Sequence, residues 1–589
     1  MPLAEEDLKH FIGGATLAAK LIYNHVTRDM NPLGPENPLV FATGPFTGTP
    51  IPMVSRFAVC GISPLTGLWG EGTSGGSFGF RLKGSGYDGI FFTNASDTPA
   101  YLYLDKDVAE LRDASHLWGK DSYETQKILF DEVGEKGVSI ACIGVAGENM
   151  ARTASILNDE GRTVGRCGIG AIMGSKNLKA VVVAGNQRAQ IADQGALRAV
   201  INEVMDVIRG NFISVAFREY GTLMYMDMGM TLGDVPVKYF QKSIFPVQKL
   251  TGHALRQNYV VENYACMGCP VGCGRTIKEF HGTETIDGPE YETVVAFGPL
   301  CMNFDWDSII RANQMCNAHG IDTISAGVAI AYAMYLFEKG TLTRERAGMD
   351  INWGDSEAIV KLLDMTIKRE GIGDLLSQGT LAMAKEFGRD PGEAAQVKGM
   401  EMPMHDDRAF HGMAISYATG PRGACHLKGD YYNIELGSFI AEYMLLPGDR
   451  LSSVGKGEAA AKYQSFKDLF DSLTLCKFSP MTPTQICKAL TAVTGRDITP
   501  EELLQAGDRS INIKRAISNK LGLTREGDRV PKICLEPLTE GSTAGSVPDM
   551  DLMLRDYYTY RGWDWETGRP SRAKLEELGL SQAASDLHQ

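Results

Sequence analysis

Four cysteines have the types and spacing of a ligand set for a metal ion or an iron–sulfur cluster. Cys266, Cys269 and Cys273 lie in one short run, CMGCPVGCGR, and Cys476 follows much later in DSLTLCKF. Three thiolates in a tight loop, together with a distant fourth, can close a tetrahedral set around a metal or a four-iron cluster. The fold, rather than the loop alone, must therefore complete this site.

Other interpretations compete with a 4Fe-4S cluster. Radical enzymes that use S-adenosylmethionine usually carry the longer spacer first and need only three cysteines, whereas here the two-residue spacer comes first. Structural zinc normally uses two ligand pairs with similar short spacers, and a clustered triplet that contains Pro270 and Gly272 resembles a cubane-cluster loop more closely. Zinc stays open on spacing alone. Ordinary buried thiols also stay open, because free cysteine is among the most buried residue types.

The remaining cysteines give no sign of a disulfide framework. They are scattered singly, mostly among apolar neighbours: Cys60, Cys142, Cys167, Cys301, Cys316, Cys425, Cys487 and Cys534. The N-terminus, MPLAEEDLKHF, has no basic segment that leads into an apolar core, as a secretion signal would. We therefore expect a protein of the reducing cytoplasm.

Length and charge restrict the class of protein. A chain of 589 residues exceeds what one hydrophobic core normally serves, which predicts two to four domains. The longest apolar stretch, 324–337, is too short to span a bilayer and is expected to form a buried helix. The net charge is −14, and no block of basic residues interleaved with aromatic residues occurs. We expect neither a membrane span nor a nucleic-acid partner.

The change from β-rich runs to helical periodicity along the sequence predicts an α+β fold with a β-rich first domain and two mostly helical domains. Up to about residue 190, runs such as PLVFATG, GIFFTN, YLYLD, VSIACIGVAG and LKAVVVAG alternate with glycine-rich turns. Helical periodicity follows, as in a helix capped by Asp355 or Ser356 and stopped near Gly371. The loop GMEMPMHDDRAFHG interrupts these helices near residue 400. The expected domains are 1–190, 191–400 and 401–589.

Two glycine-rich segments of the first domain are candidate cofactor cradles. GEGTSGGSFGF (70–80) and GRCGIGAIMGSKNLKA (165–180) are expected to be loops whose backbones can approach a phosphate or a polar heterocycle. The second misses the spacing of the dinucleotide-binding fingerprint by one residue and precedes a strand instead of following one. Tight turns in a β-rich domain are the competing interpretation.

Two further segments contain residues suited to proton transfer. GPEYET (288–293) places Glu290 and Glu292 beside an apolar stretch, where desolvation would raise the pKa of a carboxyl group toward a useful range. ATGPRGACHLKG (418–429) places His426 beside a glycine turn, which suits a proton donor. A solvated turn and a structural histidine are the corresponding alternatives.

Taken together, these segments carry a family resemblance. The chain resembles the aldehyde:ferredoxin oxidoreductase family, enzymes in which pyranopterin dithiolenes hold tungsten, or sometimes molybdenum, beside a 4Fe-4S cluster. The resemblance covers nearly the whole chain. Its motifs occur in the order of the family: ENPLVFATGPFTGTPIP, SRFAV, SPLTGLWGE, SGGSFGFRLKGSGYDGI, GRCGIGAIMGSKNLKAVVVAG, CMGCPVGCGR, GPEYET, GIDTISAG, YATGPRGACHLKG and DSLTLCKF.

The resemblance implies a β-rich base for two pterins, residues 1–190, closed by two helical domains. It implies that Cys266, Cys269, Cys273 and Cys476 bind the cluster, and that Asp322 and Asp471 accept hydrogen bonds from pterin nitrogens. A magnesium ion that bridges the pterin phosphates is a further expectation. The other residues implied to face the cofactor are Arg56, Gly75, Gly76, Ser77, Gly79, Arg166, Cys167, Gly168 and Leu475.

For catalysis the resemblance points to Glu292 and His426 beside the metal, with Glu290 as the near alternative. It implies that an aldehyde and water become a carboxylic acid, and that two electrons leave through the cluster to ferredoxin or an iron–sulfur subunit. Glu292 would take a proton and His426 would hydrogen-bond the carbonyl oxygen. The substrate itself cannot be read from these motifs.

Departures from the family pattern leave alternatives open. Ser77 stands where the family often has asparagine, and the Glu-x-x-His pair with which some members bridge subunits through a metal is absent from the sequence. A homodimer that lacks such a metal bridge remains compatible with the sequence. A relative that reduces aromatic thioesters binds its tungsten through a cysteine, and Cys301 keeps a benzoyl-CoA-reductase-like activity open. A non-catalytic iron–sulfur electron-transfer protein is the alternative of a different class.

Overall fold

Two sheets form the N-terminal part of the computed structural model, which describes residues 2–134 and 137–588. The first sheet is antiparallel, in the order β3-β2-β1-β4, with β1 (Leu39–Ala42), β2 (Phe57–Ile62), β3 (Trp69–Ser74) and β4 (Gly89–Phe92). The second has the order β6-β5-β10-β7-β8-β9, with β5 (Ala100–Asp105), β6 (Ala109–Asp113), β7 (Val138–Cys142), β8 (Ile156–Asn158), β9 (Arg162–Val164) and β10 (Leu178–Ala184). The five β-rich runs of the sequence become β1, β4, β5, β7 and β10, which confirms them.

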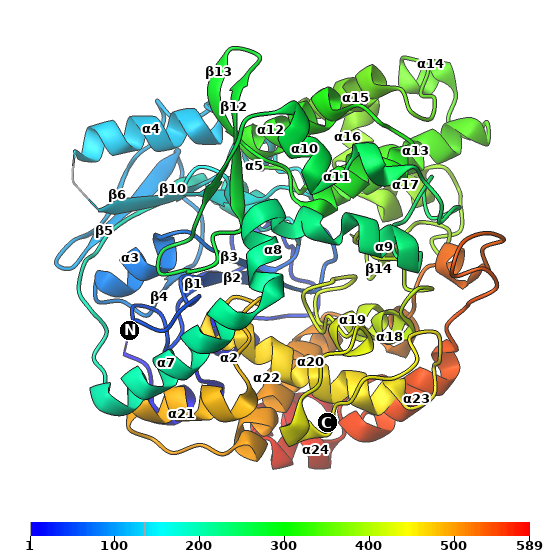
Figure 1. Ribbon diagram of the computed structural model, residues 1–589. Helices are drawn as coiled ribbons and strands as arrows, with labels where there is room; N and C mark the ends of the chain where they lie inside the picture. The colour runs from blue at the N-terminus through cyan, green and yellow to red at the C-terminus, as the bar shows by residue number, and fades with distance from the viewer. Residues whose placement is uncertain (1, 135–136, 589) are drawn as a thin grey trace.

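The second sheet is antiparallel except where β10 pairs with β5. Its strands β7 and β10 are largely buried, as their β-branched sequences VSIAC and LKAVVVA predict. Helices of this part of the chain surround the two sheets (Figure 1): α1 (Glu5–Phe11), α2 (Gly14–Tyr23), α3 (Phe78–Gly84), α4 (Ser122–Val133), α5 (Val145–Glu148) and α6 (Ile169–Ser175).

The prediction that residues 70–80 form a loop is wrong in part. Residues 70–74 belong to β3, and α3 begins at Phe78, so the loop is limited to residues 75–77. Gly72 lies in the strand because β9 packs closely on it: a Cβ at this position would lie 2.6 Å from a methyl carbon of Val164. The second glycine-rich segment also follows a strand, β9, and its centre forms α6, which the sequence did not predict.

The rest of the chain is mostly helical, so the α+β class is confirmed. Its helices are α7 (Gln194–Gly210), α8 (Phe212–Tyr220), α9 (Met226–Leu232), α10 (Gly252–Asn258), α11 (Tyr291–Phe297), α12 (Trp306–His319), α13 (Thr323–Glu338), α14 (Arg344–Ala347), α15 (Ser356–Lys368), α16 (Ile372–Leu376), α17 (Thr380–Glu386), α18 (His411–Thr419), α19 (Tyr432–Glu435), α20 (Lys456–Leu473), α21 (Pro483–Thr494), α22 (Pro500–Lys520), α23 (Met550–Arg561), α24 (Arg572–Glu577) and α25 (Ser581–Leu587). Two small sheets interrupt them: β11 (Val261–Tyr264), β12 (Gly274–Phe280) and β13 (Thr283–Asp287) in one, β14 (Gln396–Val397) and β15 (Met400–Glu401) in the other.

Two helices follow the sequence closely. The carboxylate of Asp355 accepts a hydrogen bond from the amide of Ala358, which caps α15, and the helix ends just before Gly371. The apolar stretch 324–337 forms the buried helix α13. Among the described residues, no helix has both the length and the apolar composition needed to cross a lipid bilayer.

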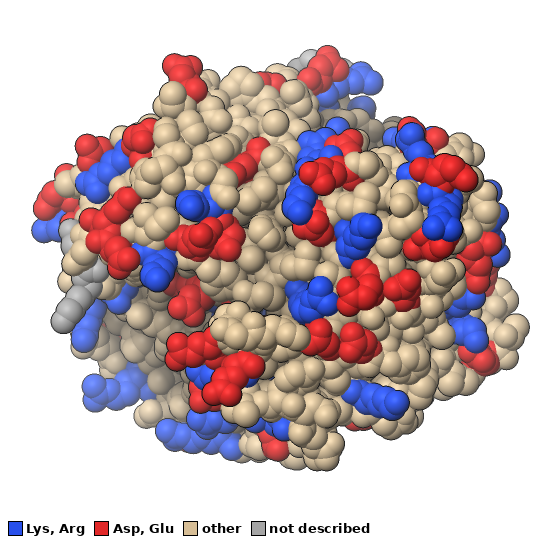
Figure 2. Space-filling view, turned by 90° about the horizontal axis from the view of Figure 1, so that it is seen from above, with Lys and Arg blue, Asp and Glu red and all other residues tan. Residues whose placement is uncertain are grey.

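The parts of the chain share buried surface. The largest hydrophobic core contains Phe46 from the segment after β1, Val295 from α11, Leu469 from α20 and Tyr557 from α23. A second core packs α2 against β2 and α22, so the first and last parts of the chain are in contact. The expected boundaries near 190 and 400 stay predictions. Charged side chains of both signs are interspersed over the face seen in Figure 2.

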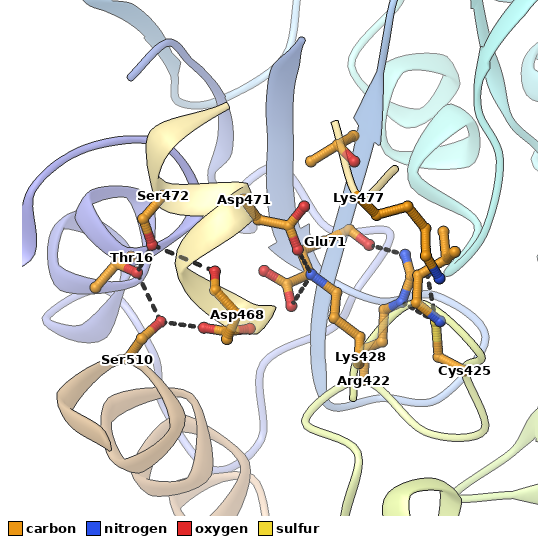
Figure 3. Close-up of polar contacts among 12 residues, drawn as sticks. Thr16, Glu71, Arg422, Cys425, Lys428, Asp468, Asp471, Ser472, Lys477 and Ser510 are labelled. Carbon is orange, nitrogen blue, oxygen red and sulfur yellow. Dashed lines mark hydrogen bonds and ion pairs between the residues drawn. The ribbon is translucent and has the colours of Figure 1, made fainter. Parts of the chain in front are cut away.

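A buried group of charged side chains joins the first sheet to the C-terminal helices (Figure 3). Glu71 of β3 is 1% exposed, and its carboxylate oxygens lie 2.8 Å from Lys428 Nζ and 2.9 Å from Lys514 Nζ. Lys514, on α22, also lies 2.7 Å from Asp468 of α20, and Lys428 pairs with Asp471. Burial alone would raise the pKa of Glu71, but the two lysines hold it at about 2.

We expect Lys514→Met to lower the free energy of unfolding by about 3 to 5 kcal/mol, because it leaves Glu71 and Asp468 buried with uncompensated charge. Lys488→Met is the matched control, since Lys488 is exposed and lies 3.3 Å from the exposed Glu203. Its expected effect is within about 1 kcal/mol. Thermal unfolding measures both variants, and equal midpoints would contradict the prediction.

The pH dependence follows from the lowered pKa of Glu71. A carboxyl group with a depressed folded-state pKa contributes stability above its ordinary pKa of 4.5, and that contribution is lost as the pH falls toward 2. The stability difference between the wild type and Lys514→Met is therefore expected to narrow on acidification below pH 4.5.

Candidate cluster and active site

The three clustered cysteines lie in a hairpin loop between β11 and β12. The strands pair in antiparallel fashion up to Tyr264 and Gly274, so residues 265–273 form the loop that they close. Inside it, the amide of Cys269 donates to the carbonyl of Cys266 at 3.0 Å. All three thiols are half-buried.

The fourth cysteine reaches this hairpin through the segment between β1 and β2. The amide of Cys476, just after α20, donates to the carbonyl of Met53 at 2.8 Å, and the amide of Met53 faces the carbonyl of Gly268 at 3.5 Å. Arg56 extends one guanidinium nitrogen to 3.8 Å from the Cys476 sulfur. The structure therefore brings together the four cysteines that the sequence singled out.

The donor set fits an iron–sulfur cluster better than a single zinc ion. Burial raises the pKa of Cys273 to about 12, and Cys476 and Cys266 are close enough to raise it as well. Among the described residues, however, no three of the four sulfurs lie within 4.8 Å of one another. One zinc ion would hold them at about 3.8 Å, given its bond length of about 2.3 Å. A cubane of iron and sulfide spaces its cysteines more widely.

The glycines of the first loop allow a close approach to this site. A Cβ on Gly75 would lie 2.7 Å from the Cys266 sulfur, and one on Gly76, where φ is +91°, would lie 2.0 Å from a carboxylate oxygen of Asp159. Gly79, in α3, packs on the carbonyl of Arg56. The loop is therefore a cradle that larger residues would fill.

Asp159 fills the amide end of that cradle. Its carboxylate accepts hydrogen bonds from the amide of Ser77, from the amide of Phe78 at 3.3 Å, and from the hydroxyl groups of Ser77 and Ser139, both at 2.8 Å. An anion thus sits where the sequence analysis expected a phosphate to bind. The position of Asp159, two residues before Gly161, carried no signal that could have predicted this role.

The second glycine-rich segment supplies an arginine that contacts three residues far from it in the sequence. Arg166 donates from Nη1 to the carbonyl of Ala424 and from Nη2 to that of Glu401, both at 2.6 Å, and its Nε lies 3.3 Å from Asp322. Asp322 also caps α13 by accepting from the amide of Ile324. Thus Arg166 and Asp322, both predicted to face the pterin, lie together.

The other residues predicted to face the pterin each have contacts of their own within the protein. Cys167 and Gly168 both adopt positive φ angles at the start of α6, and the Cys167 thiol lies 3.6 Å from the carbonyl of Glu71. Asp471 is held by Lys428, and Leu475, buried beside Cys476, donates its amide to Phe470. Lys428 was not predicted from the sequence, although it stands two residues after His426.

Glu292 and His426 face each other, and the two atoms that meet are buried. Glu292 lies in the first turn of α11, and its Oε2 accepts from the amide of Met404 at 2.8 Å. Its Oε1 lies 3.5 Å from His426 Nδ1 and 3.4 Å from His405 Nε2. Neither Glu292 Oε1 nor His426 Nδ1 has a hydrogen-bond partner among the described residues. The hydrogen-bonding capacity of these two atoms is therefore unused within the described part of the chain.

His405 and Asp234 extend this pair. Asp234, fully buried, lies 2.5 Å from His405 Nδ1 and accepts from the hydroxyl of Tyr225 at 2.9 Å. The ring of Tyr432 stacks on His405 with centroids 4.9 Å apart. The sequence analysis missed both His405 and Asp234. It noted the segment MPMHDDR, which contains His405, only as part of a boundary loop. The histidine between methionine and two aspartates was the signal that could have drawn attention to it.

Burial sets the charges of this site. Desolvation raises the pKa of Glu292, and it lowers the pKa of His426 well below its ordinary value, so that this imidazole is neutral at pH 7. Burial alone would also lower the pKa of His405, but Asp234 and Glu292 raise it. A carboxylate beside one neutral and one readily protonated imidazole can accept and pass on a proton.

The near alternatives occupy different surroundings. Glu290 occupies the N-cap position of α11 without a capping hydrogen bond from its side chain. Its carboxylate accepts a hydrogen bond from the hydroxyl of Thr222 and lies 3.2 Å from Arg275 Nη2, so it is already engaged. The Cys301 thiol donates to the carbonyl of Ala296 at 3.3 Å inside the hydrophobic core, and burial raises its pKa. Neither faces Glu292 Oε1 in the way that the two histidines do.

Comparisons with known proteins identify the family. Residues 1–185 match the profile described as aldehyde ferredoxin oxidoreductase, N-terminal domain, and residues 199–580 match the one described as domains 2 and 3. The chain belongs to the aldehyde ferredoxin oxidoreductase family. The resemblance inferred from the motifs is thereby confirmed.

Relatives of this family cover the chain almost completely. The tungsten-containing aldehyde ferredoxin oxidoreductase of Pyrococcus furiosus is 38% identical over 586 residues, which are 98% of this chain and 96% of the relative. That of Thermococcus kodakarensis is 37% identical with the same coverage. Among solved structures, the active site complex BamBC of benzoyl coenzyme A reductase has a TM-score of 0.86 at 25% identity, covering 100% of this chain and 95% of that one.

We expect Asp234→Asn to lower the pKa of His405, because it removes the negative charge that lies nearest to the ring. NMR titration of protein labelled in its histidine rings measures this pKa, with His405→Gln to assign the signal. Asp227→Asn, an exposed position in α9, is the control and should leave the titration unchanged. An unchanged His405 titration in Asp234→Asn would show that Asp234 does not control this ring.

Proposed function

We propose that this protein oxidises an aldehyde to a carboxylic acid with a tungsten or molybdenum pterin cofactor, and that the electrons leave through a 4Fe-4S cluster to ferredoxin or an iron–sulfur subunit. The observation that carries the proposal is the pair of unpartnered buried atoms, Glu292 Oε1 and His426 Nδ1, 3.5 Å apart. They occur in a family whose relatives carry the name tungsten-containing aldehyde ferredoxin oxidoreductase.

The residues that would hold the cofactors come from all parts of the chain. Cys266, Cys269, Cys273 and Cys476 would bind the cluster, and Arg56, Arg166, Asp322, Asp471 and the loop of Gly75, Gly76, Ser77 and Gly79 would contact the pterins, with Cys167, Gly168 and Leu475 beside them. When bound, the metal accepts the two electrons of the oxidation and the cluster transmits them singly. The magnesium ion stays a prediction.

Residues of the chain accept and transfer the protons that the oxidation releases. Oxidation of an aldehyde, with water as the source of the added oxygen atom, yields a carboxylic acid, two protons and the two electrons that the metal would accept. Glu292 accepts a proton at Oε1, the oxygen left free by the Met404 amide. His426, neutral because of burial, hydrogen-bonds the carbonyl oxygen of the substrate. The Nε2 atom of His405, whose ring is positioned by Asp234, lies 3.4 Å from Glu292 Oε1 and accepts the proton from Glu292.

One observation matches the benzoyl-CoA-reductase-like alternative without favouring it: the structural similarity to that enzyme's active-site complex. The identity of 25% is below the 38% shared with an aldehyde ferredoxin oxidoreductase. Cys301, the thiol that kept this alternative open, lies in the hydrophobic core. A non-catalytic electron carrier would have no use for the proton-accepting arrangement around Glu292.

We expect Glu292→Gln to lower aldehyde-dependent reduction of a viologen dye by about a hundredfold or more while the metal content is unchanged, because the amide cannot accept a proton. Glu284→Gln, an exposed position in β13, is the matched control. In the wild type, the rate should fall as the pH is lowered through the raised pKa of Glu292, above 4.5, because the protonated acid cannot act as a base. Full activity of Glu292→Gln would remove Glu292 from the mechanism.

We expect elemental analysis of protein purified without oxygen to find about four irons and one tungsten or molybdenum per chain, without zinc. Cys476→Ser should lose iron and the broad visible absorbance of the cluster, because it removes the ligand that closes the set. Cys487→Ser, a buried thiol in α21, should retain both. One zinc per chain would overturn the cluster assignment, and iron without tungsten or molybdenum would favour an electron carrier.

A further inference from the structure

A guanidinium group from the second sheet lies at the base of the cysteine hairpin. Arg162 begins β9, the edge strand that pairs with β8. The central carbon of its guanidinium group lies 4.6 Å from the centre of the Tyr264 ring, which belongs to the last residue of β11. A Cβ on Gly274, the first residue of β12, would lie 2.6 Å from Arg162 Nη2. Arg162 therefore contacts both ends of the loop 265–273.

The hydrogen-bond donors of this guanidinium group are unused. Nε and Nη2 of Arg162 are both buried, and neither has a hydrogen-bond partner among the described residues. Two carboxylates lie nearby but are engaged, because Asp287 accepts from two tyrosine hydroxyl groups and Glu290 accepts from Thr222 and Arg275. A buried donor without an acceptor is destabilising, and a charged one more so. The two N–H groups therefore require an acceptor that the oxygen atoms of the described residues do not supply.

Sulfur atoms are the acceptors that remain near Arg162. Burial alone would lower the pKa of this guanidinium group, but Tyr264, Cys266 and Cys273 raise it above its ordinary value. Burial raises the pKa of Cys273, and Arg162 acts against that rise. Hydrogen bonds to the sulfur atoms of an iron–sulfur cluster, together with its net charge and its exposure to solvent, set the reduction potential of the cluster. The location and the free donors of Arg162 are those of a residue that makes such hydrogen bonds.

We propose that Arg162 donates hydrogen bonds to the sulfur atoms of the 4Fe-4S cluster site and raises the reduction potential of the cluster. The inference rests on the proposed function, in which Cys266, Cys269, Cys273 and Cys476 bind that cluster. A cluster gains negative charge when it accepts an electron, and a buried positive charge beside its sulfur atoms favours the more negative state. Arg162 thus acts on the transfer of electrons away from the aldehyde, and not on the aldehyde itself.

Arg56, the other arginine near the cysteines, is bonded differently. Its Nη2 lies 3.8 Å from the Cys476 sulfur, and its Nη1 lies 3.4 Å from the carbonyl and hydroxyl oxygens of Thr73. Arg56 therefore already has acceptors within the protein, whereas Nε and Nη2 of Arg162 have none among the described residues. Arg56 precedes β2 of the first sheet and Arg162 lies in the second sheet, so a substitution of Arg162 leaves the contacts of Arg56 in place.

The test compares the holoenzyme with Arg162→Met, which removes the charge and the donors, and with Arg162→Lys, which keeps the charge. Arg112→Met is the matched control, since Arg112 lies on β6 at the opposite edge of the same sheet, with its guanidinium 4.1 Å from the centre of the Tyr103 ring. Redox titration followed by EPR measures the midpoint potential of the cluster. We expect the equilibrium constant for its reduction to fall about tenfold in Arg162→Met, which is about 59 mV for one electron. The shift should be smaller in Arg162→Lys and absent in Arg112→Met.

A second readout separates hydrogen bonding from structural support. Proton ENDOR spectra of the reduced cluster, recorded in water and in deuterium oxide, detect exchangeable protons close to its sulfur atoms. We expect couplings in the wild type and in Arg112→Met that are lost in Arg162→Met. If Arg162→Met loses its iron, Arg162→Lys decides: altered couplings support the hydrogen bonds, and couplings and a midpoint potential equal to those of the wild type overturn them.

Other results have a definite meaning. If Arg162→Met keeps its iron and its midpoint potential but loses tungsten or molybdenum, the donors of Arg162 serve the pterin and the inference is overturned. If the wild type reduces no viologen with any aldehyde, yet the midpoint potential falls in Arg162→Met, the proposed function fails and the role of Arg162 is retained. Aldehyde-dependent activity together with unchanged potentials and couplings in both Arg162 variants would overturn the inference and leave the proposed function standing.

Discussion

A carboxylate removed from water must be neutralised by a neighbouring charge, and the arrangement of this protein depends on how Glu71 meets that requirement. Its two lysines come from different parts of the chain, Lys428 from the loop that carries His426 and Lys514 from α22. Removing either lysine would leave Glu71 with a buried charge that is not fully compensated. The free-energy cost of keeping such a charge out of water is far larger than the stabilisation from a surface ion pair. The first sheet, the His426 loop and the C-terminal helices are consequently held in one relative position.

Glu292 meets the same requirement incompletely, and this difference distinguishes the structural carboxylate of Glu71 from the one that we propose to be catalytic. Glu71 has two cations and a lowered pKa, whereas Glu292 has one backbone amide, two imidazoles at 3.4 and 3.5 Å, and a raised pKa. The fixed network keeps the His426 loop in place, so the unpartnered atoms of Glu292 and His426 stay close without bonding each other fully. An active site needs such unsatisfied groups, and the surrounding fold has to maintain them.

Sequence patterns predicted the parts of this molecule that local physics determines. Three features depend on neighbours in the chain: apolar strands such as 138–142, the capped helix that starts after Asp355, and the cysteine spacing. The role of Gly72 could not be predicted, because it comes from Val164 on a distant strand. Asp159, Asp234 and His405 were missed for the same reason: each is an ordinary residue in its own segment and becomes significant only through a partner far away in sequence. The residues expected to face the pterin stay predictions.

The connection between β1 and β2 contacts both the cysteine hairpin and the fourth cysteine, Cys476. The carbonyl of Met53 accepts a hydrogen bond from the amide of Cys476, and the guanidinium group of Arg56 lies 3.8 Å from the Cys476 sulfur. The carbonyl of Arg56 packs against Gly79, and Pro50 and Pro52 line an open depression together with Cys266 and Cys269 of the hairpin. Proline fixes φ and offers no amide hydrogen, so this stretch has few alternative conformations. The carbonyl of Met53 and the guanidinium group of Arg56 are therefore kept in place against Cys476.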